Sequence, residues 1–316
     1  MTRPFREQPF ELPFRLGEIE LFVLRYSSLT VAATIADLQN EPKPATLPFD
    51  HFPSGVDVVV CRSERIAEPL PAITWSPEAI RYVVSQFNQY YIDLSTNMKE
   101  YLSTFSSKSR STLLRKVTRA GATLGGHVTL REYRKPDEMP EFHRLAREVS
   151  ARTYQERLLD AGLPDGAPFV ESMCHLASDD HVRAYLLFCD KRPIAYMYCP
   201  VRDGVLLYQY VGYDPQYRHG SPGTVLQYLA LEQIFAEGKF QYFDFTEGQG
   251  QHKEQLATHA ALCANICYFR PSWRSFLVLW CHQALERISR VVVGGLDRLG
   301  LKGRIKRFVR TWHWRS

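Results

Sequence analysis

The sequence Arg-His-Gly-Ser-Pro-Gly at residues 218–223 stands between a strand-like and a helix-like run. Backbone N–H groups at a helix start have no carbonyl partner within the helix, and the helix dipole adds positive potential there. Phosphate binds readily at such a place. We expect Ser221 to cap the helix, Pro222 to occupy its first turn and Gly223 to let a ligand approach the backbone, with Arg218 nearby. The turn is a candidate phosphate site, and ordinary capping without a ligand is the alternative.

A dense pattern of elements surrounds this turn and must position it. Three apolar runs separated by Lys-Arg-Pro and Asp-Gly turns predict an antiparallel meander over residues 181–214. Apolar residues at helical spacing then predict a helix over residues 221–238. After this helix, the sequence predicts a strand over 239–248, a short helix over 249–260 and a strand over 261–272. The turn therefore lies where a strand opens into a helix.

The first half of the chain mixes strands and helices. Period-two alternation predicts strands over residues 17–26 and 55–64 and a strand-rich stretch over 80–94. A helix is expected over 95–122, with Ser95 as its cap. Further along, the sequence predicts a strand over 127–135 and helices over 136–158 and 168–178.

This ordered set of motifs resembles the Gcn5-related N-acetyltransferase (GNAT) superfamily over roughly residues 91–270. In that family, the loop after the fourth core strand reads Q/R-x-x-G-x-G/A and binds the pyrophosphate of acyl-coenzyme A. Residues 218–223 read R-x-x-S-x-G, so Ser221 replaces the first glycine. The Y-x-x-G-Y-D-P run, the F-D-F strand and Lys253 are similar to a branch with cellulose- and exopolysaccharide-biosynthesis members. That branch is related to the Fem-type peptidyltransferases, which use aminoacyl-tRNA.

The resemblance implies a mixed α/β (α+β) fold of GNAT type. Its sheet is expected to be mainly antiparallel, twisted and flanked by helices, with two GNAT-like halves. We expect a degenerate half over residues 1–130, an acyltransferase domain over 131–272 and a basic amphipathic helical tail over 273–316. The donor is expected to be acetyl-CoA or another acyl-CoA. The residues expected to bind it are Tyr213, Arg218, Ser221, Pro222, Gly223 and Thr224.

Acyl transfer from a thioester to an amine needs an oriented donor, a deprotonated amine, a stabilised oxyanion and a protonated thiolate. Asp244 and Glu247 flank the end of the F-D-F strand, close to where the acyl carbon should lie in this fold. A partly desolvated carboxylate there can act as the base. A purely structural role for Asp244 stays open, since carboxylates at strand ends have both roles.

Two further residues are candidates for the chemistry. Tyr208, Tyr210 and Tyr213 alternate on the central strand, and one of them, with Tyr210 as our choice, is a candidate general acid. Aromatic residues on such a strand are more often core. The resemblance implies that Lys253 lies near the acceptor site, where it can polarise a carbonyl or bind an acidic acceptor. A solvated lysine is the alternative.

A run of basic residues lies on the helix expected before residue 122. It can meet the coenzyme's phosphates, an anionic acceptor or a tRNA, and a solvated helix face is the simpler explanation. Its members are Lys108, Arg110, Arg115, Lys116 and Arg119.

The C-terminal segment is strongly basic. From Phe269 onward there are eleven basic and two acidic residues, a net charge of +9, whereas the whole chain has +5. Apolar and basic residues alternate after residue 296, ending near Trp312 and Trp314. Tryptophans beside cationic residues suit a membrane interface. Peripheral membrane contact through this tail is therefore expected, and a tail helix packed on the body is the alternative.

Composition and cysteine spacing narrow the remaining possibilities. No signal-peptide pattern is present and the longest apolar run is too short to span a membrane, so a cytoplasmic location is expected. The seven cysteines are scattered, and neither they nor the histidines show metal-ligand spacing, so we assign no metal.

Together these features predict an acyl-CoA-dependent N-acyltransferase. The resemblance suggests acetyl transfer to an amine of an amino-sugar or a related envelope or exopolysaccharide metabolite, so a small-molecule or saccharide acceptor is expected. Two alternatives stay open. One is transfer of an aminoacyl group from tRNA. The other is a non-catalytic protein that keeps the fold and docks to a membrane or a complex.

Overall fold

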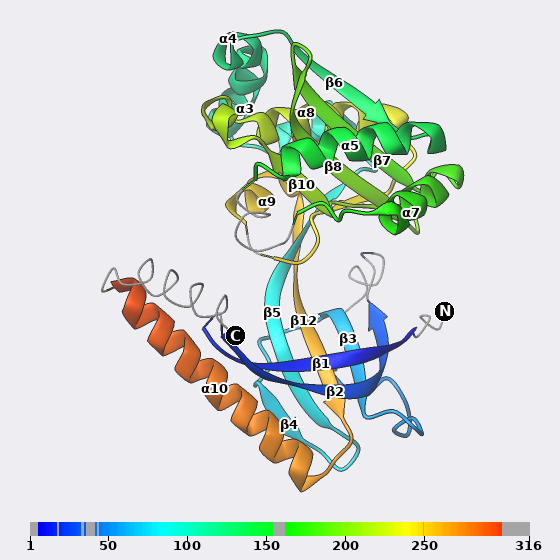
Figure 1. The fold of residues 1–316 in the computed structure, drawn as a ribbon, viewed down its shortest axis with the longest axis vertical. Helices are drawn as coiled ribbons and strands as arrows, with labels where there is room; N and C mark the ends of the chain where they lie inside the picture. Colours follow the sequence, from blue (N-terminus) through cyan, green and yellow to red (C-terminus); the bar gives the residue numbers. More distant parts are fainter. Residues whose placement is uncertain are drawn as a thin grey trace. The chain divides into compact units, whose positions relative to one another are not determined.

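The computed structural model describes residues 6–17, 19–32, 35, 42, 44–153, 162–248 and 250–298 (Figure 1). The chain divides into two compact units, one over Met1–Phe87 and Leu262–Ser316 and the other over Asn88–Ala261. This division differs from the expected boundaries at residues 130 and 272. The reason is that the chain returns to its first unit in β12 (His259–Phe269), which pairs antiparallel with β3 (Val58–Arg65). Such a return depends on long-range strand pairing, which local sequence patterns do not record.

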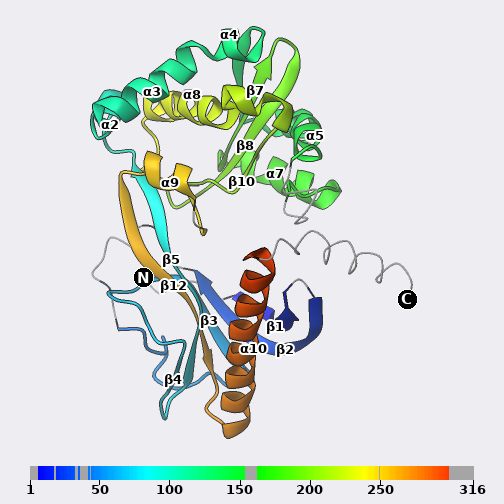
Figure 2. The ribbon, with the colours of Figure 1, turned by 90° about the vertical axis from the view of Figure 1, so that its left-hand side faces the viewer.

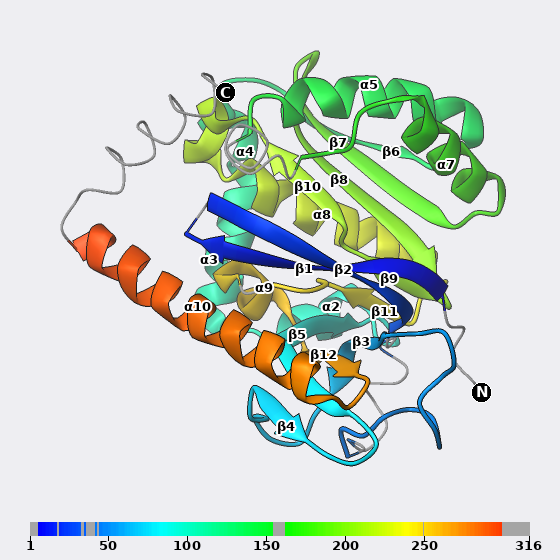
Figure 3. The same ribbon diagram turned by 60° about the horizontal axis from the view of Figure 1, so that its bottom comes forward.

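The first unit is built on mostly antiparallel strands and one long helix. β1 (Arg6–Leu16) pairs antiparallel with β2 (Ile19–Ala32), β2 pairs parallel with β3, and β4 (Ile73–Trp75) pairs antiparallel with β5 (Ile80–Asp93). Helix α10 (Trp273–Arg298) packs against β1 and β4 (Figure 3). Ser272 begins this helix, since its hydroxyl accepts a hydrogen bond from the N–H of Ser275 at 3.0 Å. β1 lies outside the strands that the sequence predicted.

The second unit contains the predicted meander. Its strands are β6 (Val128–Tyr133), β7 (Val182–Cys189), β8 (Arg192–Arg202), β9 (Val205–Leu207), β10 (Tyr210–Tyr213) and β11 (Tyr242–Asp244). All their mutual pairings are antiparallel except β9 with β11. A mainly antiparallel set of strands, flanked by helices, confirms the expected mixed fold class.

Helices cover both faces of these strands. Figure 2 shows α3 (Ser107–Thr118) and α8 (Pro222–Glu237) on one side of β7 and β8, and α5 (Met139–Ser150) and α7 (Ala167–Ser178) on the other. Each side has its own buried apolar cluster. The shorter helices of this unit are α2 (Met98–Ser103), α4 (Ala120–Leu124), α9 (Gln251–Leu256) and the 3₁₀ turns η1 (Pro136–Glu138) and η2 (Pro215–Gly220).

The helix expected over residues 95–122 is three helices, α2, α3 and α4. Asn97, and not Ser95, caps α2, because its side-chain oxygen accepts from the N–H of Glu100 at 3.0 Å. Ser106 caps α3 through the N–H of Ser109 at 3.2 Å. Short polar side chains compete for backbone groups and so interrupt a helix. The predicted amphipathic face beyond residue 298 lies outside the described residues.

Candidate active site

In the second unit, β9 and β11 first run side by side and then separate. The candidate site lies where they separate. β9 runs parallel to β11 as far as the pair Leu207 and Asp244. The N–H of Tyr208 then donates to the carbonyl of Asp244 at 2.8 Å. Beyond this point β10 pairs with β8 alone among the described strands. The single strand expected over residues 205–214 is therefore broken, and the break opens one edge of β10.

The open edge of β10 carries backbone groups suited to an extended ligand. The N–H of Asp214 donates to the carbonyl of Ile194 on the β8 side, at 2.8 Å. Alternate residues of an antiparallel strand face the same neighbour. The N–H and C=O groups of Val211 and Tyr213 therefore point toward the open edge. A strand edge of this kind can add hydrogen bonds to an extended chain.

A cavity of about 620 Å³ is lined by residues from this edge and from the start of α8. Its wall also includes Tyr208, which was one of the three tyrosines considered as a general acid, and Gln227 and His252, which were not predicted. All six residues expected to bind the donor line it, namely Tyr213, Arg218, Ser221, Pro222, Gly223 and Thr224.

The turn before α8 differs from the expected cap. Ser221 precedes the helix, but its side chain makes no capping hydrogen bond and its φ is 51°, in the left-handed region. The resemblance expects glycine here, and glycine is the residue that adopts this conformation without steric cost. Pro222 occupies the first helical turn as predicted. The prediction of a Ser221 cap was wrong, since a left-handed backbone does not have the extended conformation that a capping residue adopts.

Asp214 holds the chain between β10 and this turn. It is 1% exposed, and its carboxylate accepts from Arg192 at 2.9 Å and from Arg152 at 3.2 Å. Its other oxygen accepts from the N–H of Gln216 at 3.0 Å, which starts η2. Charge-assisted bonds on a buried carboxylate are strong and directional. Asp214 therefore fixes the position of the turn.

Gly212 allows β10 to pass close to its neighbours. A Cβ at this position would meet the ring of Tyr196 at 2.6 Å and the methyl group of Thr153 at 2.9 Å. Real Cβ atoms do not approach so closely, so a larger residue would displace the strand that borders the cavity.

Gln227 places an unsatisfied donor in the cavity wall. Its side chain is 3% exposed and its Nε2 has no hydrogen-bond partner. A buried donor without a partner is costly, so a ligand group that accepts this bond would be favoured. The sequence signal was present, because Gln227 is a polar residue one helical turn after Gly223.

Tyr208 and His252 are ionisable groups that line the cavity, with ring centroids 6.4 Å apart. Burial raises the pKa of the Tyr208 phenol, which keeps it protonated. Burial, and then the charge of Lys253, lower the pKa of His252, which keeps the imidazole neutral near pH 7. Within the described residues, no group of three or more His, Cys, Asp or Glu side chains is placed to hold a metal ion.

The four predicted catalytic residues are not among those that line the cavity. Asp244 is 5% exposed, and its carboxylate accepts from Gln89 Nε2 at 2.8 Å and from the N–H of Thr246 at 2.7 Å. Burial raises the pKa of Asp244 to about 6.

Lys253 of α9 contacts Glu247 in the loop after β11. Lys253 Nζ donates to the backbone carbonyl of Glu247 at 2.9 Å, and burial lowers the pKa of this lysine. Tyr210 packs its ring against Phe169 and Tyr198, with centroids 5.7 and 6.2 Å away. Of the four, Lys253 and Tyr210 are each adjacent in the chain to a residue that lines the cavity, His252 and Val211 respectively.

A small basic pocket adjoins the turn. It has a volume of about 170 Å³ and shares Ser221 with the larger cavity. His219 bonds through Nε2 to the carbonyl of Thr123 at 3.0 Å, which joins the turn to the residues after α3. The cations that line the pocket are Arg115, Lys116 and Arg119, which belong to the basic run seen in the sequence.

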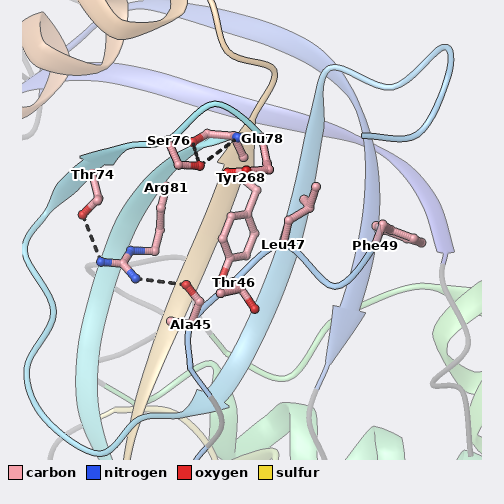
Figure 4. Close-up of a pocket in the computed structure, with 10 residues that line it drawn as sticks. Ala45, Thr46, Leu47, Phe49, Thr74, Ser76, Glu78, Arg81 and Tyr268 are labelled. Carbon is pink, nitrogen blue, oxygen red and sulfur yellow. Dashed lines mark hydrogen bonds between the residues drawn. The ribbon is translucent and has the colours of Figure 1, made fainter. Parts of the chain in front are cut away.

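Another cavity, of about 460 Å³, lies in the first unit (Figure 4). Arg81 crosses its wall and donates to the carbonyl of Ala45 at 3.0 Å and to the hydroxyl of Thr74 at 2.9 Å, with the ring of Tyr268 nearby. None of its lining residues stands at the start of a helix, so it has no phosphate site of the kind that the start of α8 offers. The cavity beside β10 is therefore the candidate active site.

Residues 107–254 match the family model of the acetyltransferase (GNAT) domain. This segment contains the separated strands, the turn and every residue that lines the 620 Å³ cavity except Leu256. The predicted resemblance to GNAT proteins is thus confirmed, and the chain carries a domain with the GNAT acyltransferase fold. A search of curated proteins finds no match.

Several solved structures are similar to the chain at low sequence identity. A conserved protein of unknown function from Bacteroides thetaiotaomicron is 14% identical, over 61% of this chain and 64% of that one, with a TM-score of 0.42. The C-terminal domain of a putative lysylphosphatidylglycerol synthetase from Agrobacterium fabrum is 12% identical, over 82% and 84%, with a TM-score of 0.48. FemX is 9% identical, over 87% and 90%, with a TM-score of 0.49. Likenesses this weak say nothing about reaction or substrate.

Proposed function

We propose that the chain is an acyl-CoA-dependent N-acyltransferase. The observation that supports this most is that one cavity joins the open edge of β10 to the start of α8. The amides of a pantetheine arm can pair with Val211 and Tyr213 along the strand edge, which orients the thioester. The pyrophosphate can lie at the turn, against the positive end of the helix dipole.

This placement of the donor gives a role to groups at the turn and on α8. Gly223 leaves room for phosphate oxygens, since the nearest atom to a Cβ there is a ring carbon of Tyr213 at 3.6 Å. Arg218 adds a charged donor, and the unsatisfied Nε2 of Gln227 adds a neutral one. The basic pocket beside Ser221 can then take a further phosphate of the coenzyme.

Direct transfer requires two proton movements, and the cavity wall holds a group for each. The amine nitrogen attacks the thioester carbonyl and forms the C–N bond, while neutral His252 accepts the proton that this nitrogen loses. The C–S bond then breaks, and the Tyr208 hydroxyl protonates the leaving thiolate. The proton on His252 can return to the phenolate through solvent, which restores both groups.

The acceptor is proposed from the resemblance alone. It is an amine of an amino-sugar or a related envelope or exopolysaccharide metabolite, and the acyl group is acetyl. Transfer from aminoacyl-tRNA is the second candidate function. The basic pocket favours it too, because the phosphates of a tRNA end would meet the same cations. A non-catalytic role would retain donor binding but show no turnover.

Replacing Gly223 with tryptophan should abolish acetyl-CoA binding, measured by isothermal titration calorimetry. The indole would occupy the space beside Tyr213 where the phosphates are proposed to lie. We expect the wild-type chain to bind and the variant to show at least about a hundredfold weaker binding, since the charge-assisted phosphate contacts would be lost. Gly223→Ala should bind nearly as well as wild type, because its Cβ makes only an ordinary contact.

Gln233→Trp, on the exposed part of the same helix, is the matched control and should bind normally. Failure of the wild type to bind acetyl-CoA would remove the acyl-CoA proposal, and titration with aminoacyl-tRNA would then test the second candidate. Donor binding without transfer to any of a panel of amines would favour the non-catalytic role.

Removing two cations from the basic pocket should weaken coenzyme A binding by about tenfold, since hydrogen bonds to charged groups contribute about 1.5–3 kcal/mol. The test variant is Arg115→Ala/Arg119→Ala. The control is Lys108→Ala/Arg110→Ala, which removes the same charge from the same helix at positions outside the pocket lining. Equal losses in both variants would mean that general attraction, and not a phosphate contact in the pocket, explains the effect.

A further inference from the structure

The outward face of α10 carries a stripe of large apolar side chains. Trp273, Leu277, Trp280, Ile288 and Val291 are each at least 50% exposed. Their spacing of three, four or eight residues places them on one side of the helix. An exposed apolar surface of this extent marks an interaction site in a water-soluble domain.

The opposite face of α10 is already used for packing. Leu279 is fully buried in the cluster that contains Leu12 and Phe14 of β1. His282 bonds through Nδ1 to the hydroxyl of Tyr82 at 2.6 Å and through Nε2 to the carbonyl of Pro13 at 3.1 Å. The helix is therefore anchored to its own unit, and the stripe is a second apolar face that faces away from β1.

The stripe continues onto the neighbouring strand. Trp75 of β4 is 49% exposed, and its ring lies 5.6 Å from that of Phe276 on α10. Trp75 and Phe276 thus form an exposed aromatic pair near the start of α10, where Trp273 is also exposed. Tryptophan prefers the boundary between water and lipid, where its apolar ring and its N–H are both accommodated.

The charge around the stripe is positive. The guanidinium of Arg274 lies 5.5 Å from the ring centroid of Trp273, and Arg287 is exposed four residues before Val291, which places it beside the stripe. Eleven basic and two acidic residues follow Phe269 in the sequence. Two copies of the chain meeting through this face would bring like charges together, whereas an anionic surface supplies the opposite sign.

We propose that the outward face of α10 binds an anionic lipid bilayer and lies flat in its headgroup region. No helix in the described part of the chain is long and apolar enough to cross a membrane, so the helix would rest on the surface. Trp273, Leu277 and Trp280 insert between the headgroups, and the arginines pair with lipid phosphates. This proposal is independent of the reaction that the second unit performs.

Vesicle flotation of the full chain tests the proposal. The probes are vesicles of phosphatidylcholine alone and of phosphatidylcholine with about a third phosphatidylglycerol, which carries the negative charge. The wild type should float with the anionic vesicles, and raising the salt to about 1 M should weaken this binding. The variant Trp273→Ser/Leu277→Ser/Trp280→Ser should lose at least about tenfold in partitioning, because it removes the inserted apolar area.

The control variant is Leu21→Ser/Val84→Ser, which changes exposed apolar residues of the same unit outside α10 and should float as the wild type does. Unchanged flotation of the α10 variant would overturn the proposal, even if the wild type binds. A wild type that does not float, but forms a dimer in light scattering that the α10 variant loses, would overturn it in favour of a second copy of the chain. Because the substituted side chains are exposed, the variant should keep the thermal stability of the wild type.

Discussion

Replacing His252 with glutamine should lower the rate of acyl transfer by about a hundredfold to a thousandfold, while acetyl-CoA still binds. His252 lines the cavity, and burial keeps its pKa below the usual value, so its imidazole is neutral and able to accept a proton at pH 7. Glutamine is similar in size but cannot accept a proton at this pH. The measurement is steady-state transfer to an amine, with donor binding followed separately by calorimetry.

The pH dependence supplies a second readout. A general base acts in its deprotonated form, so kcat/KM should rise with pH through the pKa of His252, which lies below 6.5, and then level off. This rise of kcat/KM with pH should be absent in His252→Gln. His175→Gln is the matched control, because His175 is exposed on α7 and should leave both rate and profile unchanged.

Asp244 is the competing candidate for the general base, and a variant of Asp244 distinguishes it from His252. Burial raises the pKa of Asp244 to about 6, so a general base at Asp244 would make kcat/KM rise over the same pH range. Its carboxylate oxygens are held by Gln89 and Thr246, and it does not line the cavity. We therefore expect Asp244→Asn to keep its rate within about tenfold of the wild type, as a structural carboxylate would. A large loss in Asp244→Asn with a normal His252→Gln would instead assign the base to Asp244.

Local signals in the sequence predicted the part of the site that depends on local structure. Pro222 and Gly223 stand at a helix start because their own backbone properties suit it, and the surrounding apolar runs have the spacing of strands and a helix. All six donor-binding candidates line one cavity for this reason. They are close in the chain, so a correct turn was enough to bring them together.

The catalytic candidates depend on contacts that no local pattern records. β9 pairs with β11, whereas β10 pairs only with β8 among the described strands, because the chain beyond Asp244 turns away, with Thr246 at a φ of 59°. That separation, and the position of α9, decide that His252 lines the cavity while Asp244 is enclosed. Tyr208 and Tyr210 would share one face of a continuous strand, but the break between β9 and β10 places them in different apolar clusters, and the sequence did not show this break.

Replacing Arg183 with methionine should lower the free energy of unfolding by about 3 kcal/mol or more, which is the usual result of removing one partner from a buried ion pair. Arg183 is fully buried on β7, and its guanidinium donates to Glu237 at the end of α8 and to Asp180 at 2.7 Å. Its charge also lies 5.0 Å from the ring centroid of Phe240. Methionine fills a similar volume but leaves Glu237 without its buried cation.

Urea unfolding followed by circular dichroism measures this loss. Arg134→Met is the matched control, because Arg134 is 46% exposed and approaches the same two carboxylates only at 3.9–4.0 Å, so it should cost less than about 1 kcal/mol. Equal losses in both variants would contradict the claim that the ion pairs of the buried Arg183 with Glu237 and Asp180 stabilise the fold.

The ion pairs around Arg183 also determine how the free energy of unfolding changes at low pH. Hydrogen bonds and charge from Arg183 and Lys239 outweigh burial and lower the pKa of Asp180 to about 2. A carboxyl whose pKa is depressed on folding contributes stability above its unfolded pKa, and this contribution is lost as the pH falls from about 4 toward 2. The wild type should therefore lose more stability than Arg183→Met over this interval. Since Glu237 ends the helix whose start forms the proposed donor site, the variant should also bind acetyl-CoA more weakly at temperatures near its lowered midpoint.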